Sequence, residues 1–141
     1  CEPNVANIIP EKVMFTLDVR DVDPEGIDIP VAEIEKLLDS TARKHGVKKQ
    51  MTLVAEAAPI KLADDVIEII EEEAKRRGIR YKLMNSGAVH DSSMLADVTS
   101  VGMIFVPSVN GRSHVQYEKT EFEDIKLGCD LLLGAVYKLA S

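Results

Sequence analysis

The sequence is poor in several residue types, and each shortage excludes a class of protein. Its 141 residues include two cysteines and no tryptophan, and aromatic residues make up only 4% of the chain. The two cysteines, Cys1 and Cys129, lie far apart and form neither a disulfide framework nor a metal-binding spacing, which favours a reducing, cytoplasmic compartment. No apolar run approaches the roughly 20 residues that a membrane-spanning helix needs, so no membrane partner is expected.

Basic residues are in the minority, because 17 lysines and arginines stand against 24 aspartates and glutamates, for a net charge of -7. They do not gather into a face that could follow a phosphate backbone, so nucleic acid is not expected as a partner. The chain also has no glycine-rich phosphate loop, no nucleophile elbow and no paired cysteine and histidine. What is present, 45% hydrophobic and 29% charged residues, is typical of an ordinary globular domain.

The residue patterns predict an α/β fold with a break in composition near Pro59. Alternation with period two and short apolar runs predict strands at residues 13–20, 50–58, 79–83 and 102–106. Helical apolar stripes predict helices from Pro30 to near Gly46, over residues 62–77, and from Thr120 onward, where Thr120 and Glu123 form a capping box. Residues 21–29, which contain proline and glycine, are expected to form a loop.

For two of the predicted helices, the pattern also predicts which face is exposed or buried. The acidic run at residues 71–73 lies beside the apolar stripe of its helix and is expected to be a solvated face rather than a metal site. The last helix is expected to turn one apolar stripe inward, made of Phe122, Ile125, Cys129, Leu132, Val136 and Ala140.

Polar loops at residues 85–93 and 107–114 follow predicted strands, which is where open α/β sheets bind their ligands. Each loop carries one histidine, His90 or His114, among small and turn-forming residues that let a ligand approach the backbone. Imidazole is suited both to metal binding and to proton transfer. These two histidines are therefore candidates for a functional site.

Each candidate also has a simpler interpretation, and the residue pattern leaves both open. His114 could be an exposed loop histidine without a role, and His90 could precede a helix that Asp91 caps. Arg20, on the polar face of a predicted strand, could be a solvent-facing charge, and Asn7 could be an ordinary turn residue.

Several motifs occur in a fixed order and together resemble one family. They are Asn-Ile-Ile-Pro at residues 7–10, Leu-Asp-Val-Arg at 17–20, Ser-Gly-Ala-Val-His-Asp at 86–91, Met-Ile-Phe-Val-Pro-Ser at 103–108 and Gly-Arg-Ser-His at 111–114. With them, nearly the whole chain resembles the C-terminal third of N-carbamoyl-L-amino-acid hydrolases. That family groups with allantoate amidohydrolases and β-ureidopropionases in the hydantoinase/carbamoylase group of zinc-peptidase-like amidohydrolases. Val89 stands where the family usually has a small residue such as glycine, and Ser92 replaces the usual alanine after His-Asp.

The resemblance implies a fragment of a two-domain metal-dependent amidohydrolase. Residues 1–58 would be the second half of an α+β lid and dimerisation domain, and residues 59–141 the C-terminal part of an α/β catalytic domain. The implied activity is cleavage of the carbamoyl C–N bond of N-carbamoyl-L-amino acids or related ureido acids. The implied cofactors are two divalent metal ions per active site, zinc first, with manganese or cobalt as alternatives. The implied partners are the rest of the enzyme, the small ureido-acid substrate and a second copy bound through the lid.

The resemblance also implies roles for individual residues. It makes His114 a metal ligand, and it makes His90, Asn7 and Arg20 substrate-binding residues. The general base and most metal ligands would lie upstream of this chain, so no catalytic residue is assigned and the chain alone is expected to be inactive. The alternative is a truncated, non-catalytic chain that acts as an association or interaction module through exposed strand edges.

Overall fold

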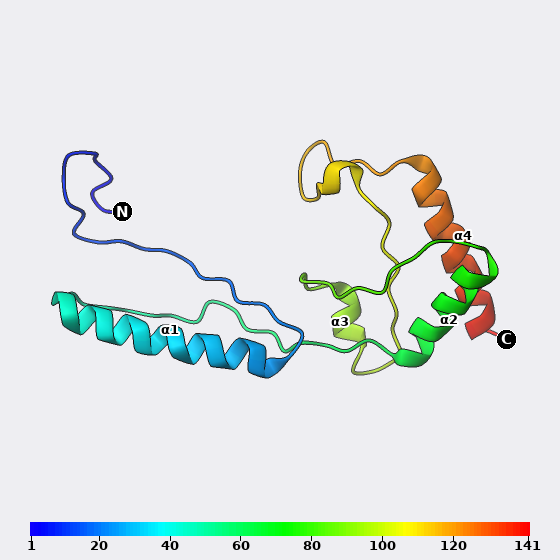
Figure 1. The fold of residues 1–141 in the computed structure, drawn as a ribbon, viewed down its shortest axis with the longest axis horizontal. Coiled ribbons are helices and arrows are strands. Elements are labelled where there is room, and N and C mark those ends of the chain that lie inside the picture. Colours follow the sequence, from blue (N-terminus) through cyan, green and yellow to red (C-terminus); the bar gives the residue numbers. More distant parts are fainter. The chain divides into compact units, whose positions relative to one another are not determined.

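The computed structural model describes all residues 1–141, and these divide into two compact units, Cys1–Pro59 and Ile60–Ser141. The regular elements are all helical. Figure 1 labels the four α-helices, which are α1 (Pro24–His45), α2 (Asp64–Arg76), α3 (Asp91–Leu95) and α4 (Phe122–Leu139), and a short 3-10 turn, η1 (Val109–Gly111), lies between α3 and α4. None of these helices combines the length and the apolarity that crossing a bilayer requires.

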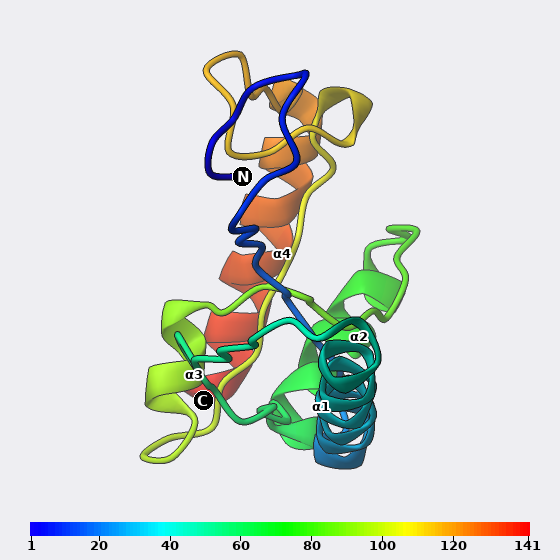
Figure 2. The same cartoon turned by 90° about the vertical axis from the view of Figure 1, so that its left-hand side faces the viewer.

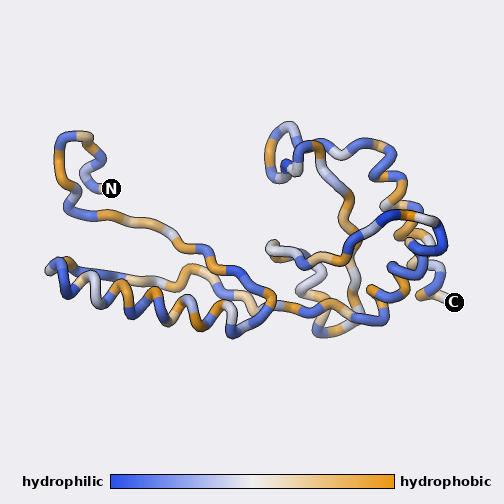
Figure 3. Tube along the Cα trace, viewed as in Figure 1, coloured by the Kyte–Doolittle hydropathy of each residue, from blue (hydrophilic) through white to orange (hydrophobic).

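The predicted strands do not pair into a sheet, so the α/β fold class is not confirmed. Residues 13–20, 50–58, 79–83 and 102–106 run as chain without strand structure, and the one β-bridge joins Glu2 to Lys12. Much of the stretch that leads into α1 is hydrophobic (Figure 3), yet Val13 and Phe15 are 60% and 69% exposed. Alternation marks a segment that can form a strand, but a strand also needs a hydrogen-bonding neighbour. No two of these segments provide one for each other.

Helix α1 begins earlier in the chain than predicted. Asp23 is its N-cap, with a side chain that accepts a hydrogen bond from the Glu25 N–H at 3.1 Å, and Pro24 occupies the first turn. The predicted start at Pro30 and the predicted loop over residues 21–29 are therefore wrong, because Pro30 lies inside the helix. The predicted end is confirmed, since Gly46 closes α1 with φ 64°, a conformation that glycine adopts without strain.

In the second unit, α2 and α4 pack against each other. The buried apolar residues of the core come from these two helices: Val66, Ala74, Leu131 and Ala135. Residues 102–106 run along α4 (Figure 2). Close approach of this stretch depends on glycines, because a Cβ on Gly102 would lie 2.6 Å from Val66 Cγ1 and one on Gly128 would lie 2.6 Å from Val106 Cγ1.

The inward stripe predicted for the last helix is wrong. Phe122, Leu132 and Val136 are 72%, 54% and 51% exposed, and Cys129 is exposed as well. The buried residues of α4 are instead Leu131 and Ala135, and Gly134 lies against Glu73 of α2. Apolar side chains occur on more than one side of α4, so periodicity alone does not tell which side is packed. The predicted capping box is also wrong, because α4 begins at Phe122 with Glu121 as an N-cap that makes no side-chain cap hydrogen bond.

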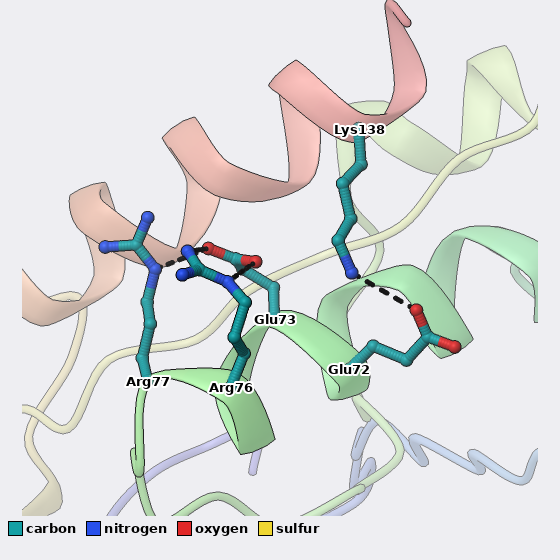
Figure 4. Close-up of polar contacts among 5 residues, drawn as sticks. All are labelled: Glu72, Glu73, Arg76, Arg77 and Lys138. Atoms are coloured by element: carbon teal, nitrogen blue, oxygen red, sulfur yellow. Dashed lines mark hydrogen bonds and ion pairs between the residues drawn. The ribbon is translucent and has the colours of Figure 1, made fainter.

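The acidic run of α2 is not uniformly solvated, which corrects the prediction for one of its members. Glu73 is only 1% exposed, although Glu72 stays exposed. The Glu73 carboxylate accepts hydrogen bonds from Arg76 Nε at 2.8 Å, Arg76 Nη2 at 2.5 Å and Arg77 Nε at 2.5 Å (Figure 4). These two arginines lie one helical turn further on and supply the partners that a buried carboxylate needs. Across the helix pair, Lys138 Nζ of α4 lies 3.2 Å from Glu72 Oε2.

Glu73 is expected to make the stability of this unit depend on acid pH. Hydrogen bonds from Arg76 and then Arg77 lower the pKa of Glu73 from its ordinary 4.5 to about 2. A carboxyl group whose folded pKa is depressed contributes stability above its unfolded pKa, and that contribution is lost as the pH falls through the folded pKa. The urea concentration at the unfolding midpoint should therefore decrease as the pH is lowered from about 4.5 to about 2.

The test is urea denaturation at a series of pH values, followed by circular dichroism. Glu73→Gln should flatten the profile over this window, whereas the matched variant Glu72→Gln, at an exposed neighbour, should leave its slope unchanged. Parallel profiles for all three proteins would show that Glu73 does not control the acid transition.

Candidate functional site

His90 is the best-defined of the candidate residues. Its side chain is half-buried, its Nε2 lies 2.7 Å from Ser86 Oγ, and its ring centroid lies 5.6 Å from that of Phe105 at an interplanar angle of 59°. Ser86 Oγ also accepts a hydrogen bond from the Ala88 N–H at 3.2 Å, which folds the loop over the same hydroxyl. The imidazole is thus held at one nitrogen by a hydroxyl and packs against an aromatic ring that is tilted relative to it.

The contacts of His90 bring two of the sequence motifs together. His90 belongs to residues 86–91 and Phe105 to residues 103–108, and a second contact joins Ser92 Oγ to Met103 Sδ at 3.0 Å. The alternative in which Asp91 caps the following helix is wrong, because His90 itself is the N-cap residue of α3 and makes no side-chain cap hydrogen bond.

His114 lies in a loop that is folded upon itself. Its side chain is exposed and its backbone has φ 58°, a left-handed conformation that few residues other than glycine and asparagine adopt. The His114 N–H donates to Glu118 Oε2 at 2.7 Å, and the Arg112 guanidinium lies 5.2 Å from the Tyr117 ring centroid. The loop therefore holds the backbone of His114 in place and leaves its imidazole accessible.

The side chains of residues 1–141 form no cluster of potential metal ligands. Nowhere in residues 1–141 do three or more histidine, cysteine, aspartate or glutamate side chains gather in a way that could hold a metal ion. A catalytic zinc site uses three protein ligands and a structural one uses four. An exposed imidazole such as that of His114 fits the role of a single ligand whose companions come from elsewhere.

In the first unit, Arg20 forms a two-pronged ion pair with Asp18. Arg20 Nε donates to Asp18 Oδ1 at 2.8 Å and Nη2 donates to Oδ2 at 2.6 Å, with both side chains exposed. The hydrogen bonds from Arg20 lower the pKa of Asp18, and the same bonds raise the pKa of Arg20. Asn7 is exposed in a turn near the start of the chain. The guanidinium thus already holds a carboxylate, the group that it is predicted to bind in a substrate.

The four residues predicted for the site fall into two pairs. Asn7 and Arg20 belong to the unit Cys1–Pro59, whereas His90 and His114 belong to the unit Ile60–Ser141. Their grouping around one substrate stays a prediction.

Sequence reasoning missed the side chains that hold two of these residues. Ser86 and Phe105 hold His90, and Asp18 holds Arg20. The spacing of Asp18 and Arg20 was a usable signal, because residues two apart on an extended chain share a face. The partners of His90 gave no comparable signal, since the contact with Phe105 joins segments that are separate in the sequence. An open pocket of about 360 Å³ was also missed, and it is lined by Arg76, Arg77, Ile79, Leu127 and Asp130.

Comparison with known proteins gives consistent matches along the chain. Peptidase family M20/M25/M40 matches residues 6–138. An N-carbamoyl-L-amino-acid amidohydrolase from Paenarthrobacter aurescens is 35% identical over 137 residues, which cover 97% of this chain and 33% of that protein. An allantoate amidohydrolase from Escherichia coli (strain K12) is 29% identical over 138 residues, which cover 98% of this chain and 34% of that protein.

A solved structure is also similar. The crystal structure of a Burkholderia cenocepacia protein assigned as an amidohydrolase/peptidase matches with a TM-score of 0.72 and 33% identity, over 82% of this chain and 28% of that one. The chain thus spans about a third of the length of the curated relatives that it matches.

Proposed function

The chain belongs to the peptidase family M20/M25/M40, and on that premise we propose that it is part of a metal-dependent amidohydrolase. The proposed reaction is hydrolysis of the carbamoyl C–N bond of N-carbamoyl-L-amino acids or related ureido acids. The observation that carries this proposal is the meeting of two motif loops at His90, in a chain whose similar proteins include an N-carbamoyl-L-amino-acid amidohydrolase. We further propose that the full-length protein is cytoplasmic and dimerises through residues 1–58, with residues 59–141 in its catalytic domain.

The proposed role of His90 is to bind the substrate at the reacting carbonyl. An imidazole N–H held in a fixed direction stabilises negative charge on the attacked oxygen, because the donor is already oriented when that charge develops. The hydrogen bond to Ser86 and the contact with Phe105 supply this orientation.

Arg20 and Asn7 are proposed to bind the carboxylate at the other end of the substrate. A guanidinium offers a planar fork that matches a carboxylate, and an asparagine amide adds a neutral donor. Binding at this end positions the scissile bond, so remote binding energy contributes to the rate.

His114 is proposed to be one ligand of a metal centre whose other ligands, and the general base, lie outside this chain. The proposed centre holds two divalent ions, with zinc first and manganese or cobalt as alternatives. When bound, such ions polarise a carbonyl and lower the pKa of water.

The test compares the full-length protein with residues 1–141 alone, using ammonia release from N-carbamoyl-L-amino acids and elemental analysis of bound metal. The full-length protein should hydrolyse these substrates and residues 1–141 should not. In the full-length protein, His114→Asn should lower the metal content and reduce activity at least about 100-fold, because an amide is a poor ligand for zinc. Asparagine tolerates the left-handed backbone of His114, so the variant keeps the loop.

The matched control is His45→Asn, at an exposed histidine in the last turn of α1. It should retain both metal and activity. Turnover by residues 1–141 alone would contradict the proposal that the other ligands and the general base lie outside this chain. Full metal content in His114→Asn would contradict the proposed role of His114.

The second candidate function is a non-catalytic association module. Exposed apolar residues on the unpaired stretch at 13–20 favour it, because an unpaired strand is a template for pairing with another chain. The coding sequence upstream of Cys1 separates the two candidates, since only the enzyme requires the remaining ligands and the general base to be encoded there.

A further inference from the structure

The ion pair between Asp18 and Arg20 has a geometry that bears on how the proposed enzyme binds its substrate. Two residues two positions apart on an extended stretch share a face, so their side chains meet without a turn. Both oxygens of Asp18 are engaged, one by Arg20 Nε at 2.8 Å and the other by Nη2 at 2.6 Å. The plane of the guanidinium is thereby fixed relative to the backbone of its own segment.

The exposure of this pair indicates that it is not needed for stability. The two side chains are 60% and 66% exposed, and exposed ion pairs contribute little to the free energy of folding. The cost of ordering an arginine is considerable, however, because its side chain has many rotamers. A neighbour that orders the guanidinium in advance reduces the entropy that is lost when a ligand binds.

We propose that Asp18 is a positioning residue for Arg20, which it holds in the orientation that receives the substrate carboxylate. This inference rests on the proposed function, because it assigns Arg20 to substrate binding. A guanidinium has five N–H donors, and an arginine can bind two carboxylates at once. The short connection keeps Asp18 beside Arg20 whether or not substrate is bound.

The opposite role would be competition, in which Asp18 occupies the guanidinium and the substrate must displace it. The two roles predict opposite changes in KM when Asp18 is removed. Loss of a positioning residue raises KM, whereas loss of a competitor lowers it.

The experiment measures KM and kcat of the full-length protein for an N-carbamoyl-L-amino acid. Asp18→Ala should raise KM about 10-fold and change kcat by less than about 2-fold, because Arg20 remains in the variant and still holds the carboxylate once the substrate is bound. Asp18→Asn keeps one oxygen acceptor and should recover part of the loss. The melting temperature should stay within about 2 °C of that of the unaltered protein, since the pair is exposed.

A double variant provides the control. In an Arg20→Ala background, Asp18→Ala should have no further effect on KM, because a positioning residue acts only through the group that it positions. An unchanged or lowered KM in the single variant Asp18→Ala, alongside a raised KM in Arg20→Ala, would overturn the role of Asp18 and leave the proposed function standing. No hydrolysis by the unaltered full-length protein would overturn both.

Discussion

Replacing Arg20 by alanine is expected to raise the KM of the full-length protein for carboxylated ureido substrates about 100-fold, with a smaller change in kcat. The reason is the loss of paired, charge-assisted hydrogen bonds to a carboxylate, which are the strong class of hydrogen bonds in proteins. Steady-state kinetics with an N-carbamoyl-L-amino acid measure this effect. The KM of Arg20→Lys should lie between those of the unaltered protein and Arg20→Ala, because lysine keeps the charge but loses the planar fork.

Two controls make the result specific to the carboxylate. Arg43→Ala removes an exposed arginine from the last turn of α1 in the same unit and should leave KM unchanged. A substrate whose carboxylate is replaced by an amide should bind poorly to the unaltered protein and should show little further loss with Arg20→Ala. A KM for the carboxylated substrate that does not change in Arg20→Ala would remove Arg20 from the site.

Replacing Gly134 by alanine is expected to destabilise the second unit by about 1–3 kcal/mol, the usual cost of overpacking a close contact. A Cβ at this position would overlap the carboxylate of Glu73. A flexible side chain usually yields to such an overlap, but this carboxylate is buried and held by Arg76 and Arg77. The overlap therefore forces either the helices apart or the ion pairs open. Urea denaturation of the full-length protein, followed by circular dichroism, measures the loss.

The matched control is Gly87→Ala, because a Cβ there would meet no atom within 4 Å. Its unfolding midpoint should stay close to that of the unaltered protein. Combining Gly134→Ala with Glu73→Ala should cost less than the sum of the two single changes, since the shortened side chain leaves space for the new methyl group. Equal midpoints for Gly134→Ala and Gly87→Ala would show that the contact between α2 and α4 is looser than described.

The sequence predicted elements that depend on local interactions better than elements that depend on contacts with distant parts of the chain. The helix expected over residues 62–77 is observed as Asp64–Arg76, because a helix with one apolar stripe and suitable end charges is specified by its own residues. The α/β sheet expected from the predicted strands is absent, since pairing depends on a partner that alternation does not identify. The buried position of Glu73 also depended on the packing of another helix, here α4 at Gly134.

The sequence indicated the family, but it did not show which side chains contact the candidate site residues. The ordered motifs indicated the family correctly, and they include His90, whose loop meets residues 103–108 as described. The contact of His90 with Phe105 was not predicted, because a loop sequence does not show which distant side chain lies beside it. The roles of Asn7, Arg20, His90 and His114 in one substrate site stay predictions.

Five glycines of this chain belong to two groups that respond differently to substitution. Gly46 and Gly78 have φ angles of 64° and 66° with open space around them, so glycine is favoured there for its left-handed backbone conformation. Asparagine can replace such a residue at modest cost. Gly102, Gly128 and Gly134 instead supply empty volume, because any Cβ there would meet a neighbouring side chain. Among variants of this chain, a polar side chain is therefore tolerable at the helix ends, whereas even a single methyl group is excessive where α2, α4 and residues 102–106 pack together.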